Sequence, residues 1–200
     1  MFNPMLLLDP SALRDPWARD ARHVALCGHP KSGKSEVARI LEDDFGGVVV
    51  DDGLILRRAA PSLLGFDPSL PFSQDGKATL ISAGERVEQV RHSLGELGNY
   101  LEARYGEDIM PIRAMQMAQE EHAEANFWIY PSVRKGQGRC YKRHGGVVVQ
   151  VNRPGCGPSG NAFDVWDESA VDIVIENDGT LEDLRERIHA LPSFLEARYG

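Results

Sequence analysis

Short apolar runs along the chain alternate with segments in which apolar residues recur at helical spacing. Five short and mostly apolar runs predict buried strands, at 23–27, 48–50, 127–130, 146–151 and 172–175. Helical spacing predicts helices between and after them, at 35–41, 54–60, 85–105, 112–125 and 181–191. Residues 61–76 are expected to form a loop, and the stretch after residue 130 has room for a short helix. Strands that alternate with helices indicate an α/β fold with a parallel sheet covered on both faces.

The chain of 200 residues has the size of one ordinary domain. Residues 1–21 carry several prolines and are expected to pack as an N-terminal extension. Because no linker interrupts the rest, we predict a single domain over residues 1–200. No run approaches the roughly 20 apolar residues that a membrane span needs, so no membrane partner is expected. The three cysteines lack metal-like spacing, and a reduced, cytoplasmic setting is the simplest interpretation.

The charge of the chain is unevenly distributed. The formal net charge of −8 argues against a general affinity for nucleic acid, which stays a possible but disfavoured partner. The segment 125–163 contains none of the acidic residues and six basic ones, which are Arg134, Lys135, Arg139, Lys142, Arg143 and Arg153. A basic segment in an acidic protein favours binding of a compact polyanion, and a solvated basic face is the alternative.

Residues 28–35, Gly-His-Pro-Lys-Ser-Gly-Lys-Ser, match the pattern G-x-x-x-x-G-K-[ST] between a predicted strand and a predicted helix. Glycines at both ends of the loop let several backbone N–H groups point at one anion. Lys34 can reach the β- and γ-phosphates of a triphosphate, and the Ser35 hydroxyl can ligate Mg²⁺. We therefore predict a P-loop that binds ATP and Mg²⁺, with Lys34 also catalytic, and with these cofactor-binding residues: Gly28, Lys31, Ser32, Gly33, Lys34 and Ser35.

The P-loop by itself predicts only that a triphosphate is held. The chain is too short for a large motor architecture, and it lacks the guanine-reading pattern Asn-Lys-x-Asp. Small-molecule kinases and small regulatory ATPases are therefore the leading classes of function.

Several further blocks, in order, resemble the phage-type deoxynucleoside monophosphate kinases of the P-loop kinase superfamily. They are Val-Asp-Asp-Gly-Leu at 50–54 with Arg-Arg-Ala-Ala at 57–60, Arg-His-Ser-Leu-Gly-Glu-Leu-Gly at 91–98, Ser-Val-Arg at 132–134, the glycine- and valine-rich run 145–151 with Arg-Pro-Gly at 153–155, and Ile-Glu-Asn-Asp-Gly-Thr-Leu at 175–181. The resemblance runs from about residue 24 to residue 190 and implies a phage origin. It implies a three-layer kinase fold of about five strands, with lid or substrate segments at about 134–145 and 153–165.

The resemblance also implies roles for individual residues. The γ-phosphate of ATP would pass to a deoxynucleoside monophosphate held by Arg57, Arg58 and Arg91, whose planar forks suit phosphate oxygens. Surface ion pairs are the alternative for these arginines. Two basic residues, Arg134 and Arg153, would act in catalysis as part of a lid that closes over the transferred group.

Two further sites complete the predicted set. Asn177 and Gly179 would form a loop against the adenine, and an ordinary turn is the alternative. Asp52 follows a predicted strand, where α/β sheets place their ligands. We predict that it serves as a Mg²⁺ ligand, a substrate-binding residue and a catalytic residue, with a helix cap as the alternative.

The chain departs from this family at Ser132, where the family has aspartate. The acidic residue expected shortly afterwards is also replaced, by Gln137 and Gly138. These changes leave two alternatives open. The chain could phosphorylate another acceptor, such as a modified nucleotide, a base hydroxyl in DNA or a coenzyme precursor, or it could bind nucleotide without turnover. The oligomeric state also stays open, with a homodimer as one option.

Overall fold

The structure is a computed structural model that describes residues 23–158, 160 and 164–190. The predicted N-terminal extension, residues 1–21, lies outside the described residues. The chain divides into two compact units, the first made of the described residues of Met1–Asp52 and Pro111–Gly200, the second of Gly53–Met110. The single domain expected from the sequence stays a prediction.

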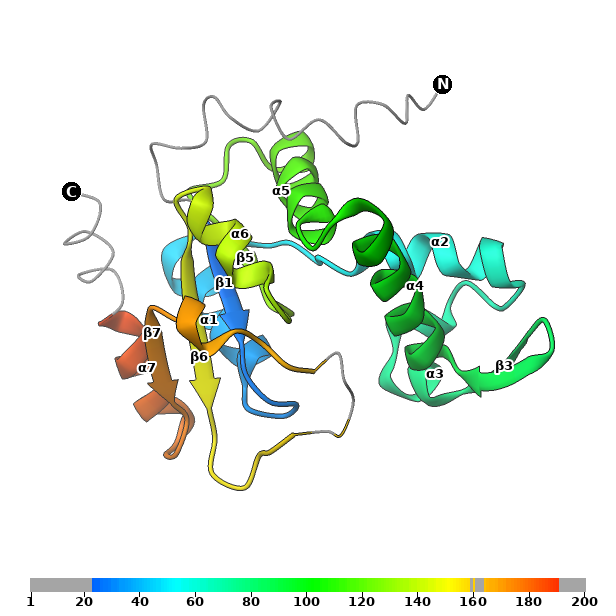
Figure 1. Cartoon of the computed structure of the whole chain (residues 1–200). Helices are drawn as coiled ribbons and strands as arrows, with labels where there is room; N and C mark the ends of the chain where they lie inside the picture. Colours follow the sequence, from blue (N-terminus) through cyan, green and yellow to red (C-terminus); the bar gives the residue numbers. More distant parts are fainter. Residues whose placement is uncertain (1–22, 159, 161–163, 191–200) are drawn as a thin grey trace. The chain divides into compact units, whose positions relative to one another are not determined.

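A parallel sheet of five described strands forms the centre of the first unit (Figure 1). The strands are β1 (His23–Cys27), β2 (Val48–Val49), β5 (Trp128–Tyr130), β6 (Val147–Asn152) and β7 (Ile173–Glu176). Their order across the sheet is β2-β5-β1-β6-β7, and every neighbouring pair is parallel. All five predicted strands are confirmed, with ends that differ by at most one residue. The strand that precedes the P-loop is therefore the central one.

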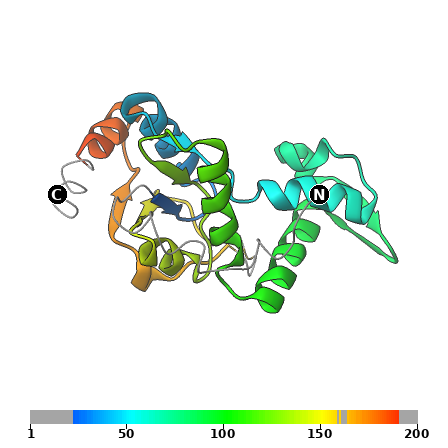
Figure 2. The same cartoon turned by 90° about the horizontal axis from the view of Figure 1, so that it is seen from above.

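Helices cover both faces of this sheet, which gives the predicted three layers. One face carries α1 (Lys34–Phe45) and α7 (Leu181–His189), and the other carries α5 (Ile109–Glu121) and α6 (Gln137–Arg143). In Figure 2, α1 and α7, coloured blue and red, lie on one side of the sheet, and α6, coloured yellow, lies on the other. Successive side chains of β1 point to opposite faces, so Leu26 joins one apolar cluster and Ala25 the other. The predicted α/β fold is confirmed.

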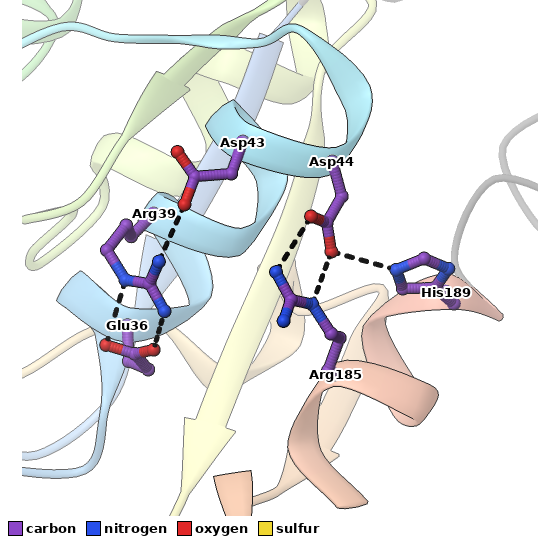
Figure 3. A network of polar contacts seen from close by, with 6 residues as sticks. All are labelled: Glu36, Arg39, Asp43, Asp44, Arg185 and His189. Carbon is purple, nitrogen blue, oxygen red and sulfur yellow. Dashed lines mark hydrogen bonds and ion pairs between the residues drawn. The ribbon is translucent and has the colours of Figure 1, made fainter. Parts of the chain in front are cut away.

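Side chains of α1 and α7 form a network of charges over their shared face (Figure 3). The carboxylate of Asp44 accepts hydrogen bonds from Arg185, at 2.7 and 2.9 Å, and from Nε2 of His189, at 2.9 Å. These bonds lower the pKa of Asp44 to about 2. Along α1 itself, Arg39 pairs with Glu36 one turn before it and with Asp43 one turn after it. The network links the helix that follows the P-loop to the last described helix.

The second unit contains helices and a hairpin. It is built from α2 (Leu54–Leu64), the 3₁₀ helix η3 (Leu70–Phe72), α3 (Gln74–Ala78), strands β3 (Leu80–Ala83) and β4 (Arg86–Gln89), and α4 (Val90–Tyr105). Strands β3 and β4 pair antiparallel. The helices α2 and α4 pack together where Gly98 leaves room for Leu56.

Two sequence predictions are wrong in this unit. The helix predicted over 85–105 begins only at Val90, because residues 86–89 find strand partners across a turn at Gly84. The loop predicted over 61–76 contains the end of α2, which continues through the buried Pro61 to Leu64, as well as η3 and most of α3. The helix ends at Gly65, whose φ of 75° is easy only for glycine.

None of the helices in the described part of the chain is long and apolar enough to cross a membrane.

Candidate nucleotide-binding site

The predicted P-loop joins the carboxyl end of β1 to the start of α1. Its backbone is left-handed at Gly28, Lys31 and Gly33, with φ of 135°, 66° and 107°. A Cβ atom added at Gly28 would overlap the carbonyl oxygen of Val151 in β6, and one added at Gly33 would overlap the side-chain amide of Asn177. Both glycines are therefore required by backbone conformation and by the atoms beside them.

The order of the strands places this loop where α/β sheets bind their ligands. From β1 the chain runs to β2, at one edge of the sheet. From the neighbouring strand β6 it runs to β7, at the opposite edge. Neighbouring strands whose connections leave in opposite directions open a crevice at their carboxyl ends. The P-loop follows one of these strands and residues 153–167 follow the other.

The first turn of α1 has no side-chain cap. Its N-cap residue is Gly33, which has no side chain to accept a hydrogen bond from the helix. Helices α3 and α7 begin with the capping side chains of Ser73 and Thr180, whereas α2, α4 and α6 share the open start of α1. The free N–H groups at a helix start and the positive end of its dipole together attract an anion. The exposed Ser35 lies in this first turn.

Lys34 closes the loop with its side chain. Its ammonium donates hydrogen bonds to the carbonyl oxygens of Gly28, at 2.7 Å, and His29, at 2.8 Å. Burial lowers the pKa of Lys34, the charge of Asp164 opposes that shift, and the charge of Arg134 adds to it. The structure therefore brings Arg134 and an unpredicted carboxylate, Asp164, into the surroundings of this lysine.

Two buried polar atoms of the loop have no hydrogen-bond partner among the described residues, Oγ of Ser32 and Nδ1 of His29. Leaving a buried polar group unsatisfied costs about 1–3 kcal/mol, so such groups often mark functional sites. Together with the uncapped helix and the lysine, they fit a site whose hydrogen bonds are completed by an anionic ligand.

The structure places residues 164–167 beside the loop, and the sequence predicted only the first two of them, as the end of a lid or substrate segment and without a site residue. The indole of Trp166 contacts the ring of His29 edge-on, with centroids 4.9 Å apart, and its Nε1 donates to Oε1 of Gln150, at 3.1 Å. The backbone N–H of Lys135 donates to the carbonyl oxygen of Val165, at 2.5 Å. These contacts hold residues 164–167 near the P-loop. Apart from the predicted lid segment, the signal in the sequence was Asp164, the first acidic residue after the long basic segment.

Asn177, predicted to bind the cofactor, contacts the P-loop directly. Its side-chain amide donates to the carbonyl oxygen of Ser32, at 2.8 Å. Its backbone N–H donates to the carbonyl oxygen of Asn152, at 2.7 Å. Gly179 lies next to the capping box that Thr180 and Asp183 form at the start of α7. A role of Asn177 and Gly179 against adenine stays a prediction.

Asp52, the predicted Mg²⁺ ligand, acts on two buried tyrosines. The pKa values of Tyr130 and Tyr141 are raised mainly by burial and further by the charge of Asp52. The carboxylate whose charge acts on Lys34 is Asp164 instead. No group of three or more His, Cys, Asp or Glu in the described ranges could hold a metal ion. The roles of Asp52 and Ser35 toward Mg²⁺ stay predictions.

The predicted acceptor-binding arginines belong to the second unit. Arg57 and Arg58 lie on α2 and Arg91 lies on α4, where Arg58 and Arg91 are exposed. Their binding of a monophosphate stays a prediction.

The basic segment of the first unit is partly neutralised by aspartates that follow it. Arg139 pairs with Asp167, and Lys142 pairs with Asp172 at 2.9 Å. Both basic residues belong to α6, which packs against the sheet through buried residues that include Cys140 and Tyr141. Arg153, just after β6, is exposed. Closure of segments 134–145 and 153–165 as a lid stays a prediction.

Comparisons with protein-family models and with curated proteins find no match. Among solved structures, the chain is similar to the protein TT1252 from Thermus thermophilus, at 20% identity, covering 88% of this chain and 99% of that one, with a TM-score of 0.50. It is also similar to a dephospho-CoA kinase from Campylobacter jejuni, at 14% identity, 86% and 96% coverage and a TM-score of 0.44. An APS kinase from Mycobacterium tuberculosis matches at 18% identity, 88% and 99% coverage and a TM-score of 0.41. At such identities, the likeness to the Thermus protein shows a shared fold.

Proposed function

We propose that this protein is an ATP-dependent kinase that transfers the γ-phosphate of ATP to a small acceptor. The observation that carries the proposal is the geometry of residues 28–35: a loop turned by two required glycines, an uncapped helix behind it, and Lys34 drawn across it. Each feature favours bound phosphate for a separate physical reason, and all three meet at the carboxyl end of the central strand.

Different groups of the loop would bind different parts of the triphosphate. Backbone N–H groups at the start of α1 would donate to phosphate oxygens, and the ammonium of Lys34 would turn from the loop carbonyls toward the β- and γ-phosphates. Bound Mg²⁺ would neutralise part of the phosphate charge, with Ser35 as a ligand and with Asp52 or Asp164 as the nearby carboxylate. Positioning and charge neutralisation supply most of the catalysis in phosphoryl transfer.

We propose a deoxynucleoside monophosphate as the acceptor, on the strength of the sequence blocks between residues 50 and 181. An oxygen of its phosphate would form a bond to the γ-phosphorus while the bond to the bridging oxygen breaks, and ADP would leave. A phosphate monoester has a second pKa of about 6, so it is ionised without help from a base. A hydroxyl acceptor would need a general base. Ser132, in place of an aspartate, is therefore compatible with a phosphate acceptor.

The test is a coupled assay of ADP release with Mg²⁺, ATP and each of the four common deoxynucleoside monophosphates. We expect turnover with at least one of them. Lys34→Ala should lower kcat/KM about 100-fold or more, because the variant loses a preorganised positive charge at the transferred group. Lys34→Arg keeps the charge but changes its shape, so an intermediate loss is expected. Melting temperatures of the variants would separate lost chemistry from lost folding.

A second pair of variants tests the acceptor side. Arg91→Ala should raise KM for the monophosphate roughly 10- to 100-fold, the value of a charge-assisted hydrogen bond, with little change in KM for ATP. Arg104→Ala, on the same helix α4, is the matched control and should change neither constant. ATP binding without turnover on any of the four acceptors would contradict the proposed acceptor. The same assay would then be run with DNA and with coenzyme precursors.

A further inference from the structure

The connection between β7 and α7 reaches the P-loop through one side chain. The amide nitrogen of Asn177 donates to the carbonyl oxygen of Ser32, and these two residues lie 145 positions apart in the sequence. The contact is close, because the amide occupies the space that a Cβ atom would take at Gly33. Asn177 therefore contacts the peptide group that joins Ser32 to Gly33.

Because that peptide group is planar, the contact with its carbonyl oxygen also constrains the direction of its N–H. In a trans peptide the carbonyl oxygen and the N–H point in opposite directions from the same rigid plane. When the Ser32 carbonyl points at Asn177, the N–H of Gly33 must point away from Asn177. The peptide contains no cis bond here, and Gly33 has the left-handed φ of 107° that begins α1. The orientation of one N–H of the P-loop is thus coupled to a hydrogen bond from a residue outside the loop.

The backbone that carries the Asn177 side chain is anchored on both sides. Its backbone N–H donates to the carbonyl oxygen of Asn152 at the end of β6, and the side chain of Asn152 donates to Glu176, at 3.1 Å. After it, the capping box of Thr180 and Asp183 fixes the start of α7. A donor anchored to a strand and a helix can hold a loop peptide in one orientation at little entropic cost.

We propose that Asn177 is a positioning residue for phosphate, which keeps the Ser32–Gly33 peptide turned so that the N–H of Gly33 donates to the triphosphate. The inference rests on the proposed function, because it takes the P-loop to be the triphosphate site. It differs from the contact with adenine that the sequence resemblance implies. A positioning residue affects every ligand that carries the phosphates, whereas an adenine contact affects only ligands that carry the base.

The experiment measures dissociation constants by calorimetry for ATP and for inorganic tripolyphosphate, which has no base, each with Mg²⁺. Asn177→Ala should weaken both ligands by the same factor, up to about tenfold for the loss of one hydrogen bond. Asn126→Ala is the matched control, since this exposed asparagine lies beside another left-handed glycine, Gly46, and should leave both constants unchanged.

Asn177→Asp adds a test that does not depend on comparing folded stabilities. An ionised aspartate has the same shape but only acceptors, so it repels the Ser32 carbonyl, whereas a protonated aspartate can donate to it. Relative to the unsubstituted protein at each pH, the affinity of this variant for tripolyphosphate should begin to recover as the pH falls from 6 toward 4, because an ordinary aspartate, with a pKa of about 3.9, takes up its proton at the acid end of this range.

Each result decides the matter. Equal weakening of both ligands in Asn177→Ala, with pH-dependent recovery in Asn177→Asp, supports the positioning role. Weakening of ATP alone would overturn it in favour of an adenine contact, and unchanged binding of both ligands would overturn it while leaving the proposed function intact. Failure of the unsubstituted protein to bind either ligand would overturn the proposed function as well.

Discussion

At the scale of single residues, the P-loop depends on two positions that must lack a side chain. Gly28 and Gly33 both adopt left-handed backbone conformations, and both stand where a Cβ would overlap a neighbouring atom. The glycine pattern was visible in the sequence, but the neighbours that enforce it, Val151 and Asn177, come from distant strands and loops. Conformation and crowding therefore act together at these two positions.

The crowding can be separated from the conformation by substitution. Gly33→Ala should lower the free energy of unfolding by about 1–3 kcal/mol, because it adds a backbone strain and a collision with the Asn177 amide. Gly65→Ala is the matched control, since Gly65 has a φ of 75° but nothing within 4 Å of its Cβ position. It should show a smaller loss, of about 1 kcal/mol. Urea unfolding of both variants checks this, and equal losses would contradict the collision.

At the scale of elements, the ends of α1 and α7 hold the site together. Helix α1 begins at the P-loop without a side-chain cap, whereas α7 begins with a complete capping box next to Asn177. The two helices are joined by Asp44 with Arg185 and His189, as Figure 3 shows. The start of α1 therefore keeps its N–H groups free of side-chain acceptors, whereas the start of α7 carries its own cap.

The capping box gives an element-scale prediction. Thr180→Ala should lower the free energy of unfolding by about 1 kcal/mol, because the variant leaves the N–H of Asp183 at the helix start without its acceptor. Thr180→Ser keeps the hydroxyl acceptor and should lose little. Thermal and urea unfolding of the two variants would test the difference, and a loss as large in Thr180→Ser as in Thr180→Ala would argue against the cap.

At the scale of the whole molecule, a cluster of the buried His23 and Tyr130 with the half-buried His144 makes the free energy of unfolding depend on pH. His23 is 1% exposed at the start of the central strand, and its Nδ1 shares a hydrogen bond of 2.9 Å with the hydroxyl of Tyr130. Burial, and then the charge of His144, lower the pKa of His23 from 6.5 to about 3. Folded His23 is therefore neutral at every pH at which the protein would normally be handled.

The sign of the effect follows from proton binding. Between about pH 6.5 and pH 3 the unfolded chain binds a proton at His23 and the folded protein does not. The free energy of unfolding should therefore fall as the pH is lowered through this window, by about 1.4 kcal/mol for each pH unit from this group alone. Urea unfolding between pH 8 and pH 4 measures the slope.

Substitution identifies the group responsible. His23→Gln removes the titrating imidazole from the cluster and should make the pH dependence shallower below pH 6.5. His122→Gln, which removes an imidazole from the same unit outside the cluster, is the control. An unchanged slope in His23→Gln would show that other groups carry the acid sensitivity.

The sequence by itself determined the five strands of the sheet and the helix α1 that follows the first strand. It also determined the phosphate loop between that strand and α1. These features depend on residues that are neighbours along the chain: short apolar runs, apolar residues at helical spacing, and glycines that permit one local turn. For the same reason the helix predicted over 85–105 was wrong in its first residues. Whether residues 86–89 form a strand depends on a partner strand, and a helical pattern in one segment carries no information about its partner.

The resemblance predicted Asn177 and residues 153–165 at the nucleotide site, but only the tertiary structure decided which atoms of the loop they contact. The order of the strands brings the connection after β7, with Asn177, and the segment after β6, with Trp166 and Asp164, to the carboxyl end of β1. It also pairs Arg139 and Lys142 with aspartates that lie beyond the basic segment. Contacts between residues so far apart arise from the packing of whole strands and helices, and no local spacing of residue types encodes them.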